Sequence, residues 1–161
     1  MVSIHWCNQR LLGSIPVSPL QRVVDRPTWL LSRAAARSQS LLATAFAAEG
    51  VRGYDFRVLA ALDELGASSQ AELGRSTGID RSDIVATVSF LVDAGLARRS
   101  PDPEDGRRNV VTITRRGSST LVRLDAAVDR VQAELLAPLT DAERRTLVVL
   151  LRKVGPVAPE E

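Results

Sequence analysis

The spacing of apolar and polar residues predicts a mainly α-helical chain with one small β-hairpin. Apolar residues recur at helical intervals in six segments, residues 28–49, 54–65, 70–77, 81–94, 115–137 and 141–154. A glycine or proline follows each segment and favours its termination. Two short β-prone runs, Leu96–Ser100 and Val110–Thr114, lie between the fourth and fifth helices, and Asp105-Gly106 supplies the turn between them.

Helix starts are marked by residues that cap free backbone N–H groups. Ser69 and Thr140 each precede a glutamate by three residues, the spacing of a capping box. Asp80 is expected to cap the fourth helix and Thr114 the fifth. These signals place two short helices on either side of a tight turn at Gly78, the arrangement of a helix-turn-helix.

The hairpin directly after this pair of helices makes the arrangement more specific. In the fourth helix Ile84, Val88 and Leu91 share one face, which leaves small and polar side chains on the others. Such a helix can enter a major groove while a basic hairpin lies along the neighbouring minor groove. We therefore predict a winged helix-turn-helix over residues 54–114.

The remaining helices carry more apolar surface than a DNA-reading core of about 60 residues can cover, so we expect a homodimer. Residues 28–53 and 115–155 are assigned to a helical dimerisation region, residues 1–27 to an N-terminal extension and residues 156–161 to a tail. The residues predicted at the dimer interface are Leu30, Leu41, Leu121, Val128, Leu135, Leu147 and Leu151.

The distribution of charge along the chain is more informative than the net charge. The 161-residue chain has a net charge of only +2, but six arginines and three acidic residues lie between Arg98 and Arg116. Lys153 is the only lysine, a bias that we attribute to a GC-rich coding genome.

Other classes of protein find little support. The sequence has no apolar run of membrane-spanning length and no secretion signal, and its single cysteine excludes an internal disulfide framework. It also lacks a phosphate-binding glycine loop, a His-Glu-x-x-His motif and a nucleophile elbow. We expect a cytoplasmic protein that is not an enzyme and that needs no metal or cofactor.

The hairpin sequence Asp102-Pro-Glu-Asp-Gly-Arg-Arg108, followed by Val111-Thr-Ile-Thr114 and Gly117, resembles the wing signature of the MarR family of bacterial transcription regulators. Residues 78–95 and 136–147 are similar to the family's recognition helix and to its last helix junction. The resemblance covers about residues 28–155. It implies a homodimer on a pseudo-palindromic double-stranded DNA operator.

The resemblance also implies roles for individual residues. Arg107 would enter the minor groove, with Asp105 bracing it, and Ala86 and Phe90 stand where relatives often carry arginine. Phosphate contacts are expected from Ser69, Gln70 and Arg75, and major-groove contacts from Arg81, Ser82, Asp83, Val85, Ala86 and Ser89. The alternative for Asp83 is that its charge serves only the N-terminus of its own helix. The hairpin arginines Arg98, Arg99 and Arg108 complete the predicted DNA-binding set.

Many relatives lose DNA affinity when a small aromatic acid binds between the winged domain and the dimer helices. By resemblance, the ligand residues here would be Trp29, Arg33, Arg37, Tyr54, Asp55 and Arg57, although each also fits an ordinary structural role. A repressor released by an aromatic or phenolic acid is the leading prediction. The alternatives are redox sensing through Cys7 and a winged-helix protein-interaction module that does not bind DNA.

Overall fold

The computed structural model describes residues 21–103, 105–106 and 108–155. By internal packing the chain divides into two units, one up to Arg37 and one from Ser38 onward. The boundary falls inside helix α2, Pro27–Ala48, whereas the sequence suggested a boundary near residue 53. None of the helices in the described ranges has the length and apolarity needed to cross a membrane.

The first unit contains a helix that the sequence did not predict. Helix α1, Gln21–Val24, lies inside the segment assigned to an irregular extension. The N–H of Arg26 donates to the carbonyl of Val23, and its Nε donates to the carbonyl of Arg22 at 2.9 Å. Helix α2 then begins at Pro27, a residue suited to the first turn because its missing N–H is not needed there.

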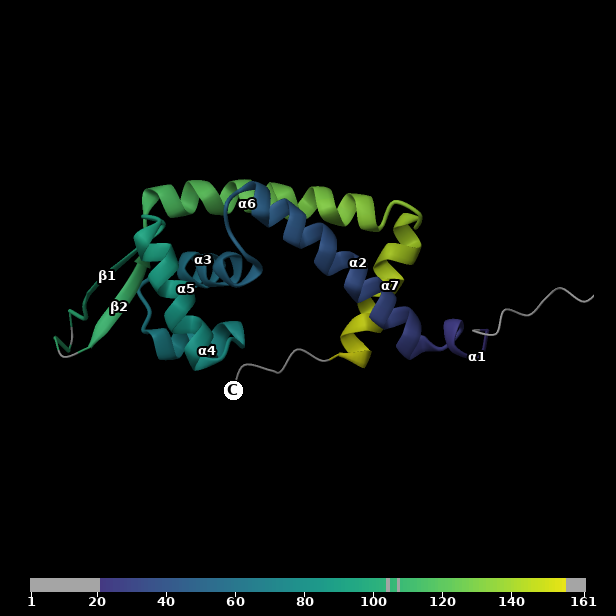
Figure 1. Cartoon of the computed structure of the whole chain (residues 1–161), viewed down its shortest axis with the longest axis horizontal. Helices are drawn as coiled ribbons and strands as arrows, with labels where there is room; N and C mark the ends of the chain where they lie inside the picture. Colours follow the sequence, from purple (N-terminus) through teal and green to yellow (C-terminus); the bar gives the residue numbers. More distant parts are fainter. Residues whose placement is uncertain (1–20, 104, 107, 156–161) are drawn as a thin grey trace, which may run out of the picture. The chain divides into compact units, whose positions relative to one another are not determined.

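The second unit contains the predicted winged helix-turn-helix. Its helices are α3, Gly53–Leu65, α4, Gln70–Thr77, and α5, Arg81–Asp93, and its hairpin strands are β1, Ala97–Pro101, and β2, Asn109–Ile113. Helices α6, Arg115–Leu135, and α7, Asp141–Val154, follow the hairpin (Figure 1). The predicted fold class is confirmed, with element ends within one or two residues of the expected positions.

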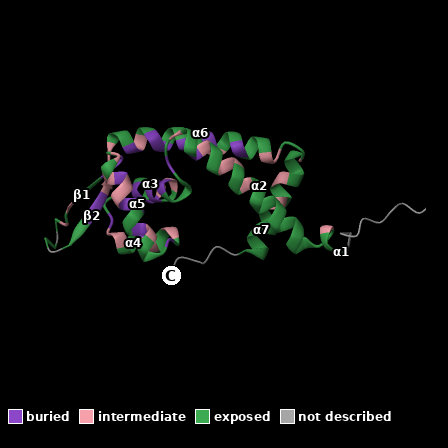
Figure 2. Ribbon diagram, in the orientation of Figure 1, coloured by how far each residue is buried: buried purple, intermediate pink, exposed green. Residues whose placement is uncertain are grey.

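The core of the second unit is built around α3. Val58, Leu59 and Leu62 of this helix are buried together with Leu73 of α4 and Val88 of α5. Figure 2 shows the buried residues gathered on α3, α5, the hairpin base and α6, whereas α7 is largely exposed. Consequently α4 and α5 are held from behind by a shared apolar core, and their outer faces stay open.

Strands β1 and β2 pair antiparallel from Ala97–Ile113 to Pro101–Asn109. Ser68, in the loop before α4, adds a short bridge to Val111 through two backbone hydrogen bonds of 3.0 and 2.8 Å. Because this bridge is made next to the start of α4, it ties the base of the hairpin to the helix-turn-helix.

The hairpin, the end of α5 and the start of α6 meet at Thr114. Its hydroxyl donates to the carbonyl of Gly95 at 2.8 Å and accepts from the N–H of Gly117 at 3.0 Å. Its N–H donates to the carbonyl of Leu96 at 3.0 Å. The predicted cap at Thr114 is therefore confirmed, and one side chain links three elements.

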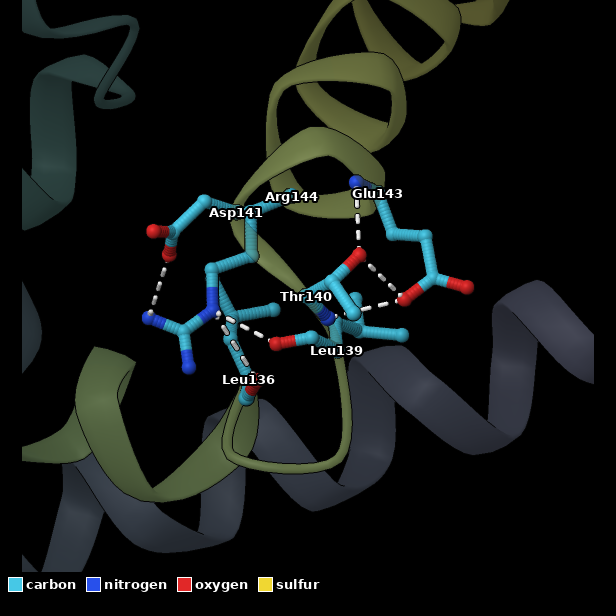
Figure 3. A network of polar contacts seen from close by, with 6 residues as sticks. All are labelled: Leu136, Leu139, Thr140, Asp141, Glu143 and Arg144. Carbon is cyan, nitrogen blue, oxygen red and sulfur yellow. Dashed lines mark hydrogen bonds and ion pairs between the residues drawn. The ribbon is translucent and has the colours of Figure 1, made fainter.

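A second polar junction joins α6 to α7. Thr140 and Glu143 form the predicted capping box at the start of α7. The Nε of Arg144 donates to the carbonyls of Leu136 and Leu139 at 3.2 and 3.1 Å, and so ties the first turn of α7 to the turn that follows α6 (Figure 3).

Gly117 offers a direct test of the hairpin junction. A methyl group there would overlap the carbonyl oxygen of Leu96 and lie 2.8 Å from Cγ1 of Ile113. We expect Gly117→Ala to lower the free energy of unfolding by about 3 kcal/mol, measured by urea denaturation. Gly106→Ala is the matched control, because no atom lies within 4 Å of the added methyl. An equal loss in both variants would contradict the close approach.

Candidate nucleic-acid interface and adjoining pocket

Helix α5 has one buried and one open face. Ile84, Thr87, Val88 and Leu91 are buried against the rest of the unit. The residues predicted to read the major groove lie on the other face: Arg81, Ser82, Val85 and Ala86 are exposed, and Asp83 and Ser89 are half-buried. This division leaves the outer face of α5 available for a partner.

The start of α5 differs in detail from the prediction. Asp80 occupies the N-cap position with extended backbone, but its side chain makes no capping hydrogen bond. The expected cap by the Asp80 carboxylate is therefore wrong, although the boundary is right. Asp83 lies in the first turn, where a negative charge interacts favourably with the helix dipole.

Helix α4 begins with the predicted capping box. The N–H and hydroxyl of Ser69 both donate to the Glu72 carboxylate at 2.7 Å, and the N–H of Glu72 donates back to Ser69 Oγ at 3.3 Å. The hydroxyl bond from Ser69, followed by the backbone bond, holds the pKa of Glu72 below its ordinary value, with smaller effects from the charges of Arg75 and Arg108. The Ser69 hydroxyl is thus engaged inside the helix terminus, so a phosphate would have to compete for it.

A hollow of about 560 Å³ lies between α4 and the start of α5, and we call it the α4–α5 hollow. Two predicted DNA-binding cations, Arg75 and Arg81, belong to its lining. The complete lining is Gln70, Ala71, Gly74, Arg75, Ile79, Arg81, Ile84 and Val85. The structure therefore brings the predicted phosphate-binding and base-reading residues together around one depression.

The hairpin carries exposed positive charge. Arg98 and Arg99 on β1 and Arg108 next to β2 are exposed. The N–H of Arg108 donates to the carbonyl of Asp105 at 2.8 Å, which closes the hairpin turn. Arg107 lies outside the described residues, so its predicted ion pair with Asp105 stays a prediction.

A second depression, of about 640 Å³, lies on the other side of α3. We call it the α2–α3–α6 pocket after the helices that supply most of its lining. Its residues are Gln39, Leu42, Ala43, Phe46, Arg52, Gly53, Tyr54, Phe56, Arg57 and Val128. Phe46 and Phe56 stack with ring centroids 5.2 Å apart, so the pocket joins an aromatic wall to two cationic side chains.

Only two of the six predicted ligand residues, Tyr54 and Arg57, line this pocket. Asp55 is fully buried and accepts a 2.7 Å hydrogen bond from the N–H of Arg52, together with two guanidinium bonds. Its carboxylate closes the start of α3, which agrees with the structural role that the sequence also allowed, and the predicted ligand role of Asp55 stays a prediction. Trp29, Arg33 and Arg37 are exposed residues of the first unit.

Arg52 is the charged residue of this pocket that the sequence analysis did not predict. Its hydrogen bond with Asp55 raises the pKa of the guanidinium, with smaller contributions from the charges of Asp55 and Asp83. The guanidinium carbon also lies 5.3 Å from the centre of the Phe90 ring on α5. The sequence feature that could have indicated this pairing is the spacing, since Arg52 precedes Asp55 by three residues at a helix start.

The residues predicted for the dimer interface differ in how far the single chain buries them. Leu121 is buried in the core of its own unit, and Val128, Leu135 and Leu147 are half-buried. Leu30 and Leu151 are exposed, and Leu41 is half-buried. Cys7 lies outside the described residues, within which no group of three or more potential metal ligands is found.

The sequence was compared with known proteins. A model described as the MarR family matches residues 50–108. The transcriptional repressor NicR of Pseudomonas putida is 30% identical over 132 residues, which cover 82% of this chain and 84% of that protein. A Thauera aromatica protein assigned to transcriptional regulation of the hcr operon is 40% identical over 86 residues, and the match spans 53% of this chain but only 52% of that protein.

Solved structures with a similar fold are also DNA-binding proteins. The structure of BpsR from Bordetella bronchiseptica, whose DNA binding is regulated by 6-hydroxynicotinic acid, superposes with a TM-score of 0.74 and 26% identity over 84% of this chain and 97% of that chain. A mutant form of MarR from E. coli, solved in complex with operator DNA, gives a TM-score of 0.70 and 26% identity over 87% and 96% of the two chains.

The capping box of α4 yields a pH-dependent prediction. Because the folded-state pKa of Glu72 is depressed, its ionised form stabilises the fold above the unfolded-state pKa of about 4.3, and this contribution is lost as pH falls through the lower folded-state pKa. We expect Ser69→Ala to raise the pKa of Glu72 toward the ordinary value of a glutamate and to cost about 1 kcal/mol at pH 7.

An NMR titration of the Glu72 carboxyl group, with urea unfolding at pH 7 and pH 3, measures both effects. Ser76→Ala on the same helix is the control, since that hydroxyl donates to the carbonyl of Leu73. An unchanged Glu72 pKa in Ser69→Ala, or a stability difference that persists undiminished at pH 3, would contradict this account.

Proposed function

This chain belongs to the MarR family of transcriptional regulators, and from that premise we propose that it is a dimeric repressor that an aromatic acid releases from DNA. Regulators of this family are generally not enzymes, and the sequence offers no catalytic motif. The proposal has three parts, which concern DNA, the dimer and the ligand.

One observation carries the DNA-binding part. The exposed side chains of α5 lie beside the α4–α5 hollow, and a hairpin with exposed arginines follows the same helix. An exposed helix face of small and polar residues fits a major groove, and the hairpin arginines supply charge for the adjacent backbone and minor groove. The E. coli MarR relative, solved with operator DNA, has the same fold.

Within this interface we propose separate roles for two arginines. Arg75 on α4 binds a phosphate and so positions the protein on any sequence. Arg81 at the start of α5 reads a base edge, for which guanine is the best chemical match because it accepts a bidentate guanidinium. The outward apolar side chain of Val85 is suited to a thymine methyl group.

The dimer part is supported by the apolar surface of α7. No residue of this helix is buried, and Leu150 and Val154 are 52% and 68% exposed. Apolar side chains spaced in this way along an amphipathic helix favour burial against a second copy of the chain. A two-fold dimer presents two α5 helices to DNA and therefore calls for a pseudo-palindromic operator.

The ligand part is supported by the composition of the α2–α3–α6 pocket. The pocket combines the stacked rings of Phe46 and Phe56 with the cations Arg52 and Arg57. Apolar walls with a few fixed charges are typical of small-molecule sites, and an aromatic carboxylate matches both features. The BpsR relative responds to such an acid, 6-hydroxynicotinic acid.

Salt dependence separates the two proposed arginine roles. Arg75→Ala should weaken binding to all duplexes alike and reduce the slope of log affinity against log salt by about one. Arg81→Ala should cost about 1–3 kcal/mol on a duplex selected in vitro and little on random DNA. Fluorescence anisotropy on both duplexes at several salt concentrations provides the measurement. Equal losses on selected and random DNA for Arg81→Ala would remove it from base reading.

The oligomeric state tests the role of α7. Leu151→Glu places a charge on the exposed apolar surface of this helix, and we expect the variant to sediment as a folded monomer in analytical ultracentrifugation. Arg145→Glu puts the same charge at an exposed polar position on the same helix and should remain dimeric. If wild type is a monomer at micromolar concentration, or Leu151→Glu stays dimeric, the proposed interface is wrong.

A further inference from the structure

The two cationic residues of the α2–α3–α6 pocket connect the pocket with the helix-turn-helix. Arg52 and Arg57 both line the pocket, and each also contacts one helix of the helix-turn-helix. The guanidinium of Arg52 lies 5.3 Å from the centre of the Phe90 ring on α5. Nη1 of Arg57 donates to the carbonyl of Thr77, the last residue of α4, at 3.2 Å.

Arg52 is paired with Asp55 but remains accessible. Its Nε and Nη2 each donate to the carboxylate of Asp55 at 3.2 Å, and Asp55 itself is fully buried. The Arg52 side chain is nevertheless 64% exposed. Because a guanidinium has more N–H donors than this pairing uses, Arg52 can donate to an incoming anion without losing Asp55.

Arg57 contacts the joint between the two reading helices. Its guanidinium carbon lies 4.8 Å from the centre of the Tyr54 ring, which also lines the pocket. The carbonyl that it binds, that of Thr77, directly precedes Gly78, whose left-handed backbone (φ 63°) makes the turn toward α5. A movement of Arg57 therefore changes a hydrogen bond at the end of α4, directly before the turn.

We infer that Arg52 and Arg57 form a two-arginine relay, in which a carboxylate bound in the pocket draws both side chains away from α5 and α4. The inference rests on the proposed function, since it assumes a DNA-binding repressor with an acid ligand. Charge-assisted hydrogen bonds to a carboxylate are stronger than an exposed cation–π contact or a single bond to a neutral carbonyl. A bound acid thus competes for the contacts that support the DNA-reading helices from behind.

The consequence for DNA follows from linkage. The ligand favours arrangements in which the arginines face the pocket, and DNA favours those in which α4 and α5 are supported. The two binding events therefore oppose each other, and the coupling must act equally in both directions. The carboxylate is the essential group of the ligand, while the ring supplies contact area against Phe46, Phe56 and Val128.

The test measures DNA affinity with and without small acids. Operator affinity of wild type, Arg52→Ala and Arg57→Ala is measured on an in vitro selected duplex, in buffer and with benzoate, 6-hydroxynicotinate or the uncharged analogue benzamide. We expect either acid to weaken wild-type binding about tenfold and benzamide to leave it unchanged. In each variant the effect of the acids should shrink to less than about twofold.

A further readout distinguishes positioning from direct contact with DNA. Without ligand, both variants should bind DNA several-fold more weakly than wild type but keep its salt slope, because neither side chain neutralises a phosphate. Arg130→Ala, an exposed arginine on α6, is the control and should retain the full acid response. A reduced salt slope in Arg52→Ala or Arg57→Ala would make that residue a DNA contact and overturn the relay.

Failure of the inference can be told from failure of the proposed function. If the acids leave wild-type DNA affinity unchanged, the ligand part of the proposed function is wrong, and the relay is wrong as well. If wild type responds and both variants respond equally, the relay alone is overturned. If a variant fails to fold, amide hydrogen exchange of the wild-type protein provides the test instead. Benzoate should accelerate exchange at the end of α4 and in α5. Unchanged exchange rates would contradict the relay.

Discussion

The close approach of α6 to the end of α5 is the constraint on which the DNA-facing side of this protein depends. The backbone at Gly117 lies against the Leu96 carbonyl with no room for a β-carbon, and Thr114 bonds to Gly95, Leu96 and Gly117 at the same point. Together with the bridge between Ser68 and Val111, this contact fixes the direction of the hairpin relative to α5. DNA binding of the proposed kind requires a fixed hairpin direction, since the groove-reading helix and the flanking hairpin must contact the duplex at the same time.

Helix α3 separates two surfaces of different chemistry. On one side its buried residues support α4 and α5, whose outer faces and neighbouring hairpin are polar and positively charged. On the other side its first turn, with Arg52 just before it, lines a pocket that has an aromatic wall. Because Arg52 and Arg57 line this pocket and also contact α5 and α4, the start of α3 is well placed to connect a small molecule with DNA.

The sequence was sufficient for the fold because its signals are local. Apolar spacing, the capping boxes at Ser69 and Thr140 and the glycines that end helices predicted nearly every element within one or two residues. The outward side chains of α5 followed from the same spacing. The α2–α3–α6 pocket was harder to predict, because it joins residues from Gln39 to Val128 and no local pattern reports such a contact. The pairing of Asp55 with Arg52 was also not predicted, since Arg52 lies outside the helix that sequence analysis delimited.

In the proposed complex, two copies of this chain place paired α5 helices and basic hairpins on one duplex. A hydroxyl-radical footprint on an in vitro selected duplex tests it most directly. We expect two equivalent protected half-sites, each flanked by a protected minor groove. Their centres should lie about one helical turn, 10–10.5 base pairs, or a multiple of it apart. A single protected half-site, or uniform weak protection without a repeat, would contradict it.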